Sequence, residues 1–199
     1  MNKRTQILKQ MTSDKMPHLI ENPVTLIKPT TTEPNSIPLP NEQAGLLEEQ
    51  ILAIAERLKI KACYLHAWLS QFSQAPLVNQ ISLLRLIEQY GLDPFLEEVD
   101  LVQYEDQSWQ AVITTQGYAR LVNACPQFKG IIYSYSEPDS SAISAWIECA
   151  IYRTDRDGPI TVREYYLEVR RDSIAWQKMP RRMLRNRAFQ QCAKMALGI

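Results

Sequence analysis

Histidine is scarce and cysteine is scattered in this chain of 199 residues. The two histidines, His18 and His66, have no metal-ligand spacing to any cysteine, and no C-x-x-C motif occurs. The cysteines are Cys63, Cys125, Cys149 and Cys192. Such wide separation does not indicate a zinc site or a disulfide framework, so we expect four reduced thiols in the core.

Long apolar runs are lacking as well. No stretch reaches the ~18–20 apolar residues that a membrane-spanning helix needs. The first residues, Met1 to Arg4, are not followed by the apolar segment of a secretory signal. We therefore expect no membrane partner and a cytoplasmic location.

The motifs of common enzyme classes are missing too. The sequence contains no G-x-x-x-x-G-K-[ST] phosphate loop, no G-x-S-x-G nucleophile elbow and no ladder of metal-binding residues. Asp155 and Asp157 flank a predicted hairpin turn, and turn chemistry explains them better than catalysis. Glu97 and Glu98 open a predicted strand, whose alternation points them to opposite faces and away from a shared metal. We expect no enzyme and no cofactor; Mg²⁺ is not indicated, and an unrecognised catalytic site stays a minor alternative.

Net charge is absent overall but strongly divided along the chain. Lys and Arg together number 22, as do Asp and Glu, so the formal charge is zero. Residues 151–199 nevertheless carry 11 basic and 5 acidic side chains, whereas residues 1–150 carry 11 and 17. The C-terminal quarter is therefore the part expected to meet an anionic partner.

Six prolines and a run of three threonines occupy residues 1–41. Proline removes a backbone donor and interrupts helices, and the apolar residues there show no sustained period. We predict an extended or disordered arm over 1–41, with the alternative of an arm that anchors on a neighbouring surface, and a single domain over 42–199.

Helical periodicity begins after the arm. Asn41 is a candidate N-cap for a first helix, and a second helix is predicted over 62–72. A third is predicted over 78–90, with Gly91 ending it. Its inward-facing residues are Ile81, Leu83, Leu84 and Ile87.

After this third helix, the pattern of apolar residues changes to a repeat of two, which is typical of strands. A hairpin is predicted from strands near 99–104 and 109–113, followed by a helix over 116–124 that Thr114 or Thr115 caps. Three further strands are predicted at 129–136, 142–153 and 160–169, the last two joined by an Asp-Gly turn. N-terminal helices, an antiparallel β-meander with an inserted helix, and a C-terminal basic helix define an α+β fold.

The C-terminal helix is predicted from Pro180 to Leu197, with Gly198 as its stop. Leu184, Ala188, Cys192 and Met195 form one apolar stripe. Between residues 178 and 194 no acidic residue occurs, and the basic residues are Lys178, Arg181, Arg182, Arg185, Arg187 and Lys194. Without acidic partners at helical spacing, these cations favour binding of a nucleic-acid backbone over an ordinary solvated surface helix.

Four sequence blocks then resemble one family in the correct order: 89–95 (Q-Y-G-L-D-P-F), 116–130, 151–159 and 176–194. They resemble the Bet/RecT family of phage-type single-strand annealing proteins. The resemblance implies ATP-independent binding and annealing of single-stranded DNA, through an annealed duplex intermediate, by a homo-oligomer that forms rings or helical filaments. It also implies a phage exonuclease and a host single-strand-binding protein as partners, in a bacterial cytoplasm. We expect the family's C-terminal partner-binding module to be absent from this chain, either by truncation or by nature.

By motif position, the resemblance makes Arg181, Arg187 and Lys194 phosphate-contacting residues, with Arg171 of the Arg170–Arg171 pair as another. A passive single-stranded nucleic-acid-binding module without annealing activity stays open as the alternative. Trp176, just before the helix-starting proline, is predicted to seat the basic helix by packing, with base stacking as the other possibility.

Overall fold

A computed structural model describes residues 40–137 and 143–199 of the chain, so most of the predicted arm lies outside the described residues. Helices come first: α2 (Pro40–Leu58), α3 (Ala62–Leu69) and α4 (Leu77–Tyr90), with a 3₁₀ turn η1 (Ser70–Phe72) after α3. Helix α2 begins at Pro40, so Asn41 lies inside the helix and its prediction as the N-cap was wrong. Proline suits a first helical position because that position's N–H would have no partner in the helix.

Helix α4 has the boundaries and the buried face that its sequence predicts. Gly91 ends it in the left-handed conformation, at φ 63°. All four predicted inward residues are buried, and the helix packs on α2. Arg57 of α2 donates to the carbonyl oxygens of Ile87 and Leu92, at 3.3 and 2.8 Å, and thereby satisfies acceptors at the end of α4.

A two-stranded antiparallel sheet follows the 3₁₀ turn η2 (Pro94–Leu96). Its strands are β1 (Val99–Gln103) and β2 (Trp109–Ile113), and Val99 pairs with Ile113. One face of this hairpin packs on α4, where Asn79 donates to the Trp109 carbonyl at 2.7 Å. The opposite face holds Tyr104 just beyond β1, and its hydroxyl lies 2.9 Å from Gln110.

Helix α5 (Thr115–Ala124) is joined directly to β2. Thr114 caps it, accepting a hydrogen bond from the Gly117 backbone N–H at 3.2 Å. Gly117 lies against the start of β1 so closely that a Cβ there would stand 2.2 Å from the Glu98 carbonyl oxygen. The glycine therefore permits α5 to dock on the hairpin.

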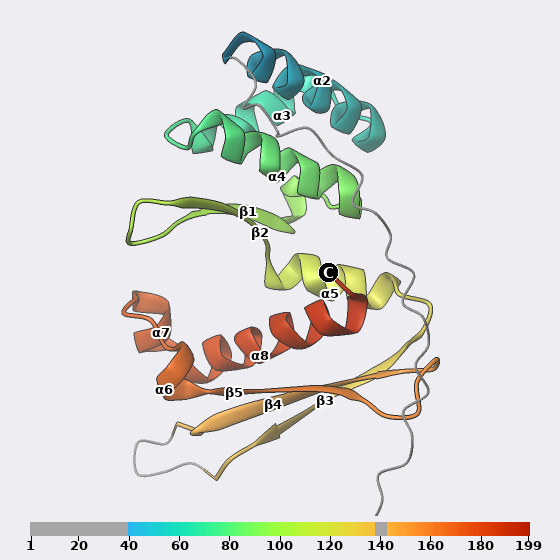
Figure 1. Cartoon of the computed structure of the whole chain (residues 1–199), viewed down its shortest axis with the longest axis vertical. Coiled ribbons are helices and arrows are strands. Elements are labelled where there is room, and N and C mark those ends of the chain that lie inside the picture. The colour runs from blue at the N-terminus through green and yellow to red at the C-terminus, as the bar shows by residue number, and fades with distance from the viewer. Residues whose placement is uncertain (1–39, 138–142) are drawn as a thin grey trace, which may run out of the picture. The chain divides into compact units, whose positions relative to one another are not determined.

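The remaining strands form a separate antiparallel sheet of order β3-β4-β5: β3 (Phe128–Tyr135), β4 (Trp146–Arg153) and β5 (Ile160–Tyr165). The α+β class is confirmed, but the described strands lie in two sheets and not in one meander, because α5 separates them (Figure 1). The predicted strand 160–169 ends early, since Tyr166–Val169 forms the short helix α6. The predicted strand from 142 begins at Trp146.

Two helices complete the chain: α7 (Ile174–Lys178) and α8 (Pro180–Leu197), which Gly198 ends at φ 73°. Helix α8 packs on β4, β5 and α5, and lies between the second sheet and α5 (Figure 1). Across the described residues, no helix combines the length and the apolar character needed to cross a membrane.

Three of the four residues in the predicted apolar stripe of α8 are fully buried, and the Cys192 thiol donates to the Ile160 carbonyl at 3.2 Å. Met195 was wrongly placed in that stripe, because its side chain is 61% exposed. The covered arc of α8 is shifted toward Phe189, Ala193 and Ala196, since α5 covers a flank that a single-sheet contact would leave open.

Candidate nucleic-acid interface

Six of the eight cations of the predicted site lie along α7 and α8. Lys178 ends α7, and the others follow on α8 from Arg181 to Lys194, a distance of about 20 Å at the rise of an α-helix. All are exposed except Arg187, which is partly covered. No acidic residue occurs within α8, so the helix itself supplies no counter-charge.

The cations do not form one row around α8. At 100° per residue, Arg181 and Arg185 fall on the same side of α8 as its buried residues. Arg187 and Lys194, seven residues apart, fall on the opposite side. Burial raises the pKa of the Tyr133 hydroxyl on β3 to about 12, and the nearby charge of Arg185 opposes that rise. The structure thus divides the predicted site into a sheet-side group and an outer group.

The outer group has a carboxylate beside it that the sequence pattern did not reveal. Glu164 on β5 lies near Arg187: burial raises the pKa of Glu164, and the charge of Arg187 opposes the rise. Gln190, about one turn further along α8, donates to the Thr115 hydroxyl of α5 at 3.1 Å. Arg187 therefore has an acidic residue of another element near it, although α8 itself contains none.

Arg170 and Arg171 lie outside α8, in the segment between α6 and α7. The guanidinium carbon of Arg171 stands 5.3 Å from the centroid of the Tyr104 ring, which belongs to the β1–β2 hairpin. This cation–π contact joins segments more than sixty residues apart in sequence. Beside it is an open cavity of about 370 Å³. The cavity is lined by Tyr166, Arg170, Arg171, Asp172, Trp176 and Gln177.

Trp176 is a core residue of this region. Its side chain is 7% exposed, and its ring centroid lies 6.1 Å from that of Tyr166. Ser173 caps α7 by accepting from the Trp176 backbone N–H, so the indole is fixed one short helix before Pro180. This burial agrees with packing as the main role predicted for Trp176, although one edge reaches the cavity.

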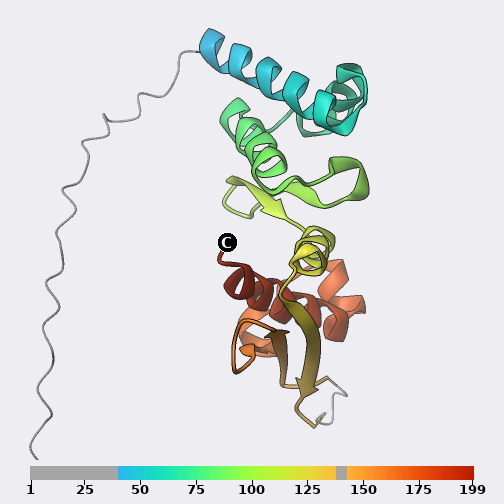
Figure 2. The same ribbon diagram turned by 90° about the vertical axis from the view of Figure 1, so that its right-hand side faces the viewer.

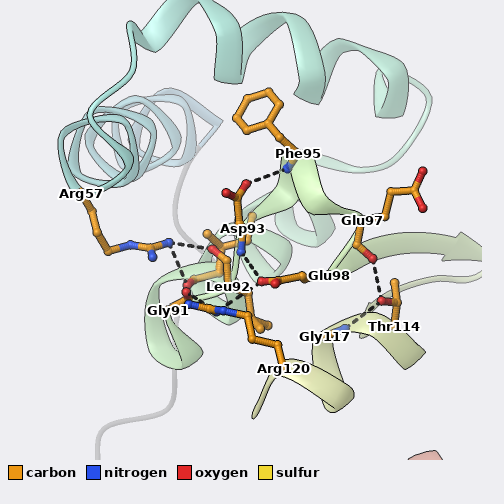
Figure 3. A network of polar contacts seen from close by, with 11 residues as sticks. Arg57, Gly91, Leu92, Asp93, Phe95, Glu97, Glu98, Thr114, Gly117 and Arg120 are labelled. Atoms are coloured by element: carbon orange, nitrogen blue, oxygen red, sulfur yellow. Dashed lines mark hydrogen bonds and ion pairs between the residues drawn. The ribbon is translucent and has the colours of Figure 1, made fainter. Parts of the chain in front are cut away.

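A polar network fixes the hairpin and α5 to the N-terminal helices (Figure 3). The buried carboxylate of Glu98 accepts from the Asp93 backbone N–H at 2.7 Å and from Arg120 at 3.2 Å. Arg120 of α5 also donates to the Gly91 carbonyl at 2.7 Å. From the sequence, Glu98 was weighed only as a metal ligand, so this structural role was not predicted.

The prediction that Glu97 and Glu98 open a strand was wrong, because β1 begins at Val99. Glu98 is buried whereas Glu97 is exposed, so the two carboxylates do not share a site. Glu97 has a left-handed backbone, φ 57°, and its carbonyl accepts from the Thr114 hydroxyl at 2.6 Å. Within residues 40–137 and 143–199, no three His, Cys, Asp or Glu side chains gather closely enough to hold a metal ion. All four cysteines are free thiols; Cys149 and Cys192 are buried, whereas Cys63 is exposed, against the expectation that all four lie in the core.

Comparison with known proteins identifies the class. The family model described as RecT family matches residues 78–199, from the start of α4 to the end of the chain. The chain belongs to the RecT family, which confirms the resemblance of the four sequence blocks. It is similar to the recombination protein bet of Escherichia phage lambda, with 34% identity over 128 residues. The match covers 59% of this chain and 46% of that relative, so the chain spans about half of its length.

Proposed function

We propose that this protein binds single-stranded DNA through the cations of α7, α8 and the Arg170–Arg171 pair, and anneals it to a complementary strand without ATP. Membership of the RecT family and similarity to a phage recombination protein support the proposal. The observation that carries it is α8 itself: a helix seated by one buried face, with five exposed or partly exposed cations and no acidic residue. The phosphate backbone is the partner such a surface fits best.

The arrangement favours contact with phosphates over reading of bases. Guanidinium and ammonium groups neutralise backbone charge without regard to sequence, so bases stay available to a second strand. The cations of α8 span about 20 Å, which matches roughly six nucleotides at 3.4 Å each. A duplex of about six base pairs is only weakly stable. Stable annealing therefore needs several subunits side by side, each contributing its own cations.

Homo-oligomerisation is therefore part of the proposal. Residues 1–150 carry an excess of six acidic side chains and residues 151–199 an excess of six basic ones. Head-to-tail contact places the acidic part of one subunit against the basic part of the next, and such contacts build rings or helical filaments. An exonuclease that produces single strands and a host single-strand-binding protein are proposed partners; no metal or other cofactor is part of the proposal.

The test measures the annealing of complementary oligonucleotides, and the binding of each, in the absence of ATP. Arg187→Ala and Lys194→Ala should each weaken DNA binding for all sequences and lower the log–log salt slope by roughly one unit or less. Arg85→Ala is the matched control, because Arg85 is an exposed cation on α4, outside the proposed site. Unchanged affinity and slope in Arg187→Ala and Lys194→Ala would leave α8 a purely structural helix.

The same assay separates annealing from passive binding. A passive module coats both strands and slows their pairing, whereas an annealing protein accelerates pairing. Slower pairing at saturating protein would therefore replace the annealing proposal with that of a single-stranded DNA-binding module.

A further inference from the structure

The cavity beside Arg171 lies outside α8 and is lined by one short segment of the chain, with a residue of a distant hairpin next to it. Its residues come from α6, α7 and the segment between them. Tyr104, in the turn of the β1–β2 hairpin, stands over Arg171 at its side. Both views place the hairpin turn on the same side of the molecule as α6 and α7 (Figure 1, Figure 2). A ligand that stacks on Arg171 in the cavity would therefore lie close to the hairpin turn.

The lining combines flat apolar surface with both kinds of hydrogen-bonding group. Tyr166 and Trp176 supply aromatic surface, and the Gln177 amide donates to the Asp172 carboxylate at 3.0 Å. The amide and carboxylate leave further donor and acceptor positions at the surface of the cavity. Arg170 and Arg171 add positive charge at its edge. At about 370 Å³, the cavity falls in the range of small-ligand sites.

These features distinguish between possible occupants. A bare phosphate would meet Arg170 and Arg171 favourably, but it would also approach the carboxylate of Asp172. A nucleobase is flat and neutral, with donors and acceptors on its edge, and its own phosphate can remain near the arginines. Tyrosine rings and guanidinium planes are the groups on which unpaired bases stack in proteins.

We infer that this cavity takes one unstacked nucleobase of the bound single strand, with Tyr104 and the guanidinium of Arg171 as its stacking walls. The inference rests on the proposed function, since it presupposes a bound single strand. In the free protein, the Tyr104 ring and the Arg171 guanidinium contact each other at the side of the cavity, and a base that enters there stacks against both. A base held there cannot pair, so the cavity holds the first strand and releases it when the complement pairs.

A cycle of protein and DNA changes tests the inference. Binding of a short oligonucleotide is compared with binding of the same oligonucleotide carrying abasic sites, which keeps every phosphate and hence the same counterion release. Base–aromatic stacking contributes about 1–3 kcal/mol, and 1.4 kcal/mol is a factor of ten, so Tyr104→Leu should lose at least about 5-fold in affinity for intact DNA. It should lose almost nothing further for abasic DNA.

Two variants control the cycle. Tyr104→Phe keeps the ring and loses only the hydroxyl that contacts Gln110, so it should retain the preference for intact DNA. Tyr64→Leu changes an exposed tyrosine on α3 and should behave as the unchanged protein. Melting curves of all three establish that the fold is intact.

The outcomes distinguish failure of the base-binding inference from failure of the proposed function. If Tyr104→Leu loses the same factor on intact and abasic DNA, or none on either, the base-binding inference is overturned. If the unchanged protein still anneals in that case, the proposed function stands without it. If the unchanged protein neither binds nor anneals, the proposed function itself fails.

Discussion

Replacement of Gly117 by alanine tests the docking of α5 on the hairpin. In an open helix, alanine is more favourable than glycine by about 1 kcal/mol. At Gly117 the new Cβ would stand 2.2 Å from the Glu98 carbonyl oxygen and 2.7 Å from a methyl carbon of Ile113. The Glu98 carbonyl cannot retreat easily, because it also accepts from the Thr114 backbone N–H at 3.0 Å.

The clash should outweigh the gain in helix propensity. Overpacking of this kind costs typically 1–3 kcal/mol and occasionally more, so Gly117→Ala should lower the free energy of unfolding by about 1–3 kcal/mol. For a protein of this size, that corresponds to a melting temperature lower by roughly 3–9 °C. The assay is thermal or urea unfolding followed by circular dichroism.

Gly45→Ala in α2 is the matched control, with the opposite sign. Nothing lies within 4 Å of a Cβ at Gly45, which is exposed. Alanine there should raise the free energy of unfolding by about 1 kcal/mol, through helix propensity alone. If Gly117→Ala proved as stable as Gly45→Ala, the close approach of α5 to Glu98 would be refuted.

Three further predictions concern the site. Trp176→Phe should cost about 1 kcal/mol of stability and leave DNA affinity per folded molecule intact; loss of affinity at an unchanged melting temperature would instead assign base stacking to Trp176. Burial raises the pKa of Glu164, so the stability that its protonated form contributes is present below its ordinary pKa and is lost as pH rises through the raised value. Glu164→Gln removes the charge beside Arg187, so this variant should bind DNA more tightly than the unchanged protein at pH 7. Its affinity should also rise less as the pH is lowered toward 5. Equal pH profiles of the two proteins would contradict a role for this carboxylate. Complementary oligonucleotides should shift the mass distribution at ~0.1 M salt toward higher oligomers, and a protein that stays monomeric on annealed DNA at micromolar concentration would refute the oligomeric model.

Features set by neighbouring residues were predictable from the sequence. Gly91 and Gly198 end their helices in the left-handed conformation, and Thr114 caps α5, because each choice depends on a few adjacent residues. The α+β class followed from the change of period along the chain.

Features set by distant contacts were not predictable in this way. Residues 166–169 continue a strand-like pattern but form α6, and periodicity alone cannot locate such an ending. The exposure of Met195 depends on α5, which covers a different flank of α8. Glu164 beside Arg187 and Tyr104 over Arg171 each join separate elements, so helical spacing within one segment could not reveal them.

The same helix, α8, supplies core residues and the proposed DNA-binding cations, and this has a consequence for screening. Its buried side packs on both β4 and α5, so unfolding of the core destroys the cationic track at the same moment. Any oligonucleotide that binds only the folded form must then raise the free energy of unfolding. At an oligonucleotide concentration of a hundred times Kd, the increase is about 2.7 kcal/mol. The shift in melting temperature therefore reports affinity for nucleic acid directly. Strands of different lengths can be ranked in this way without labels. The length at which the shift stops growing gives the number of nucleotides that each subunit covers.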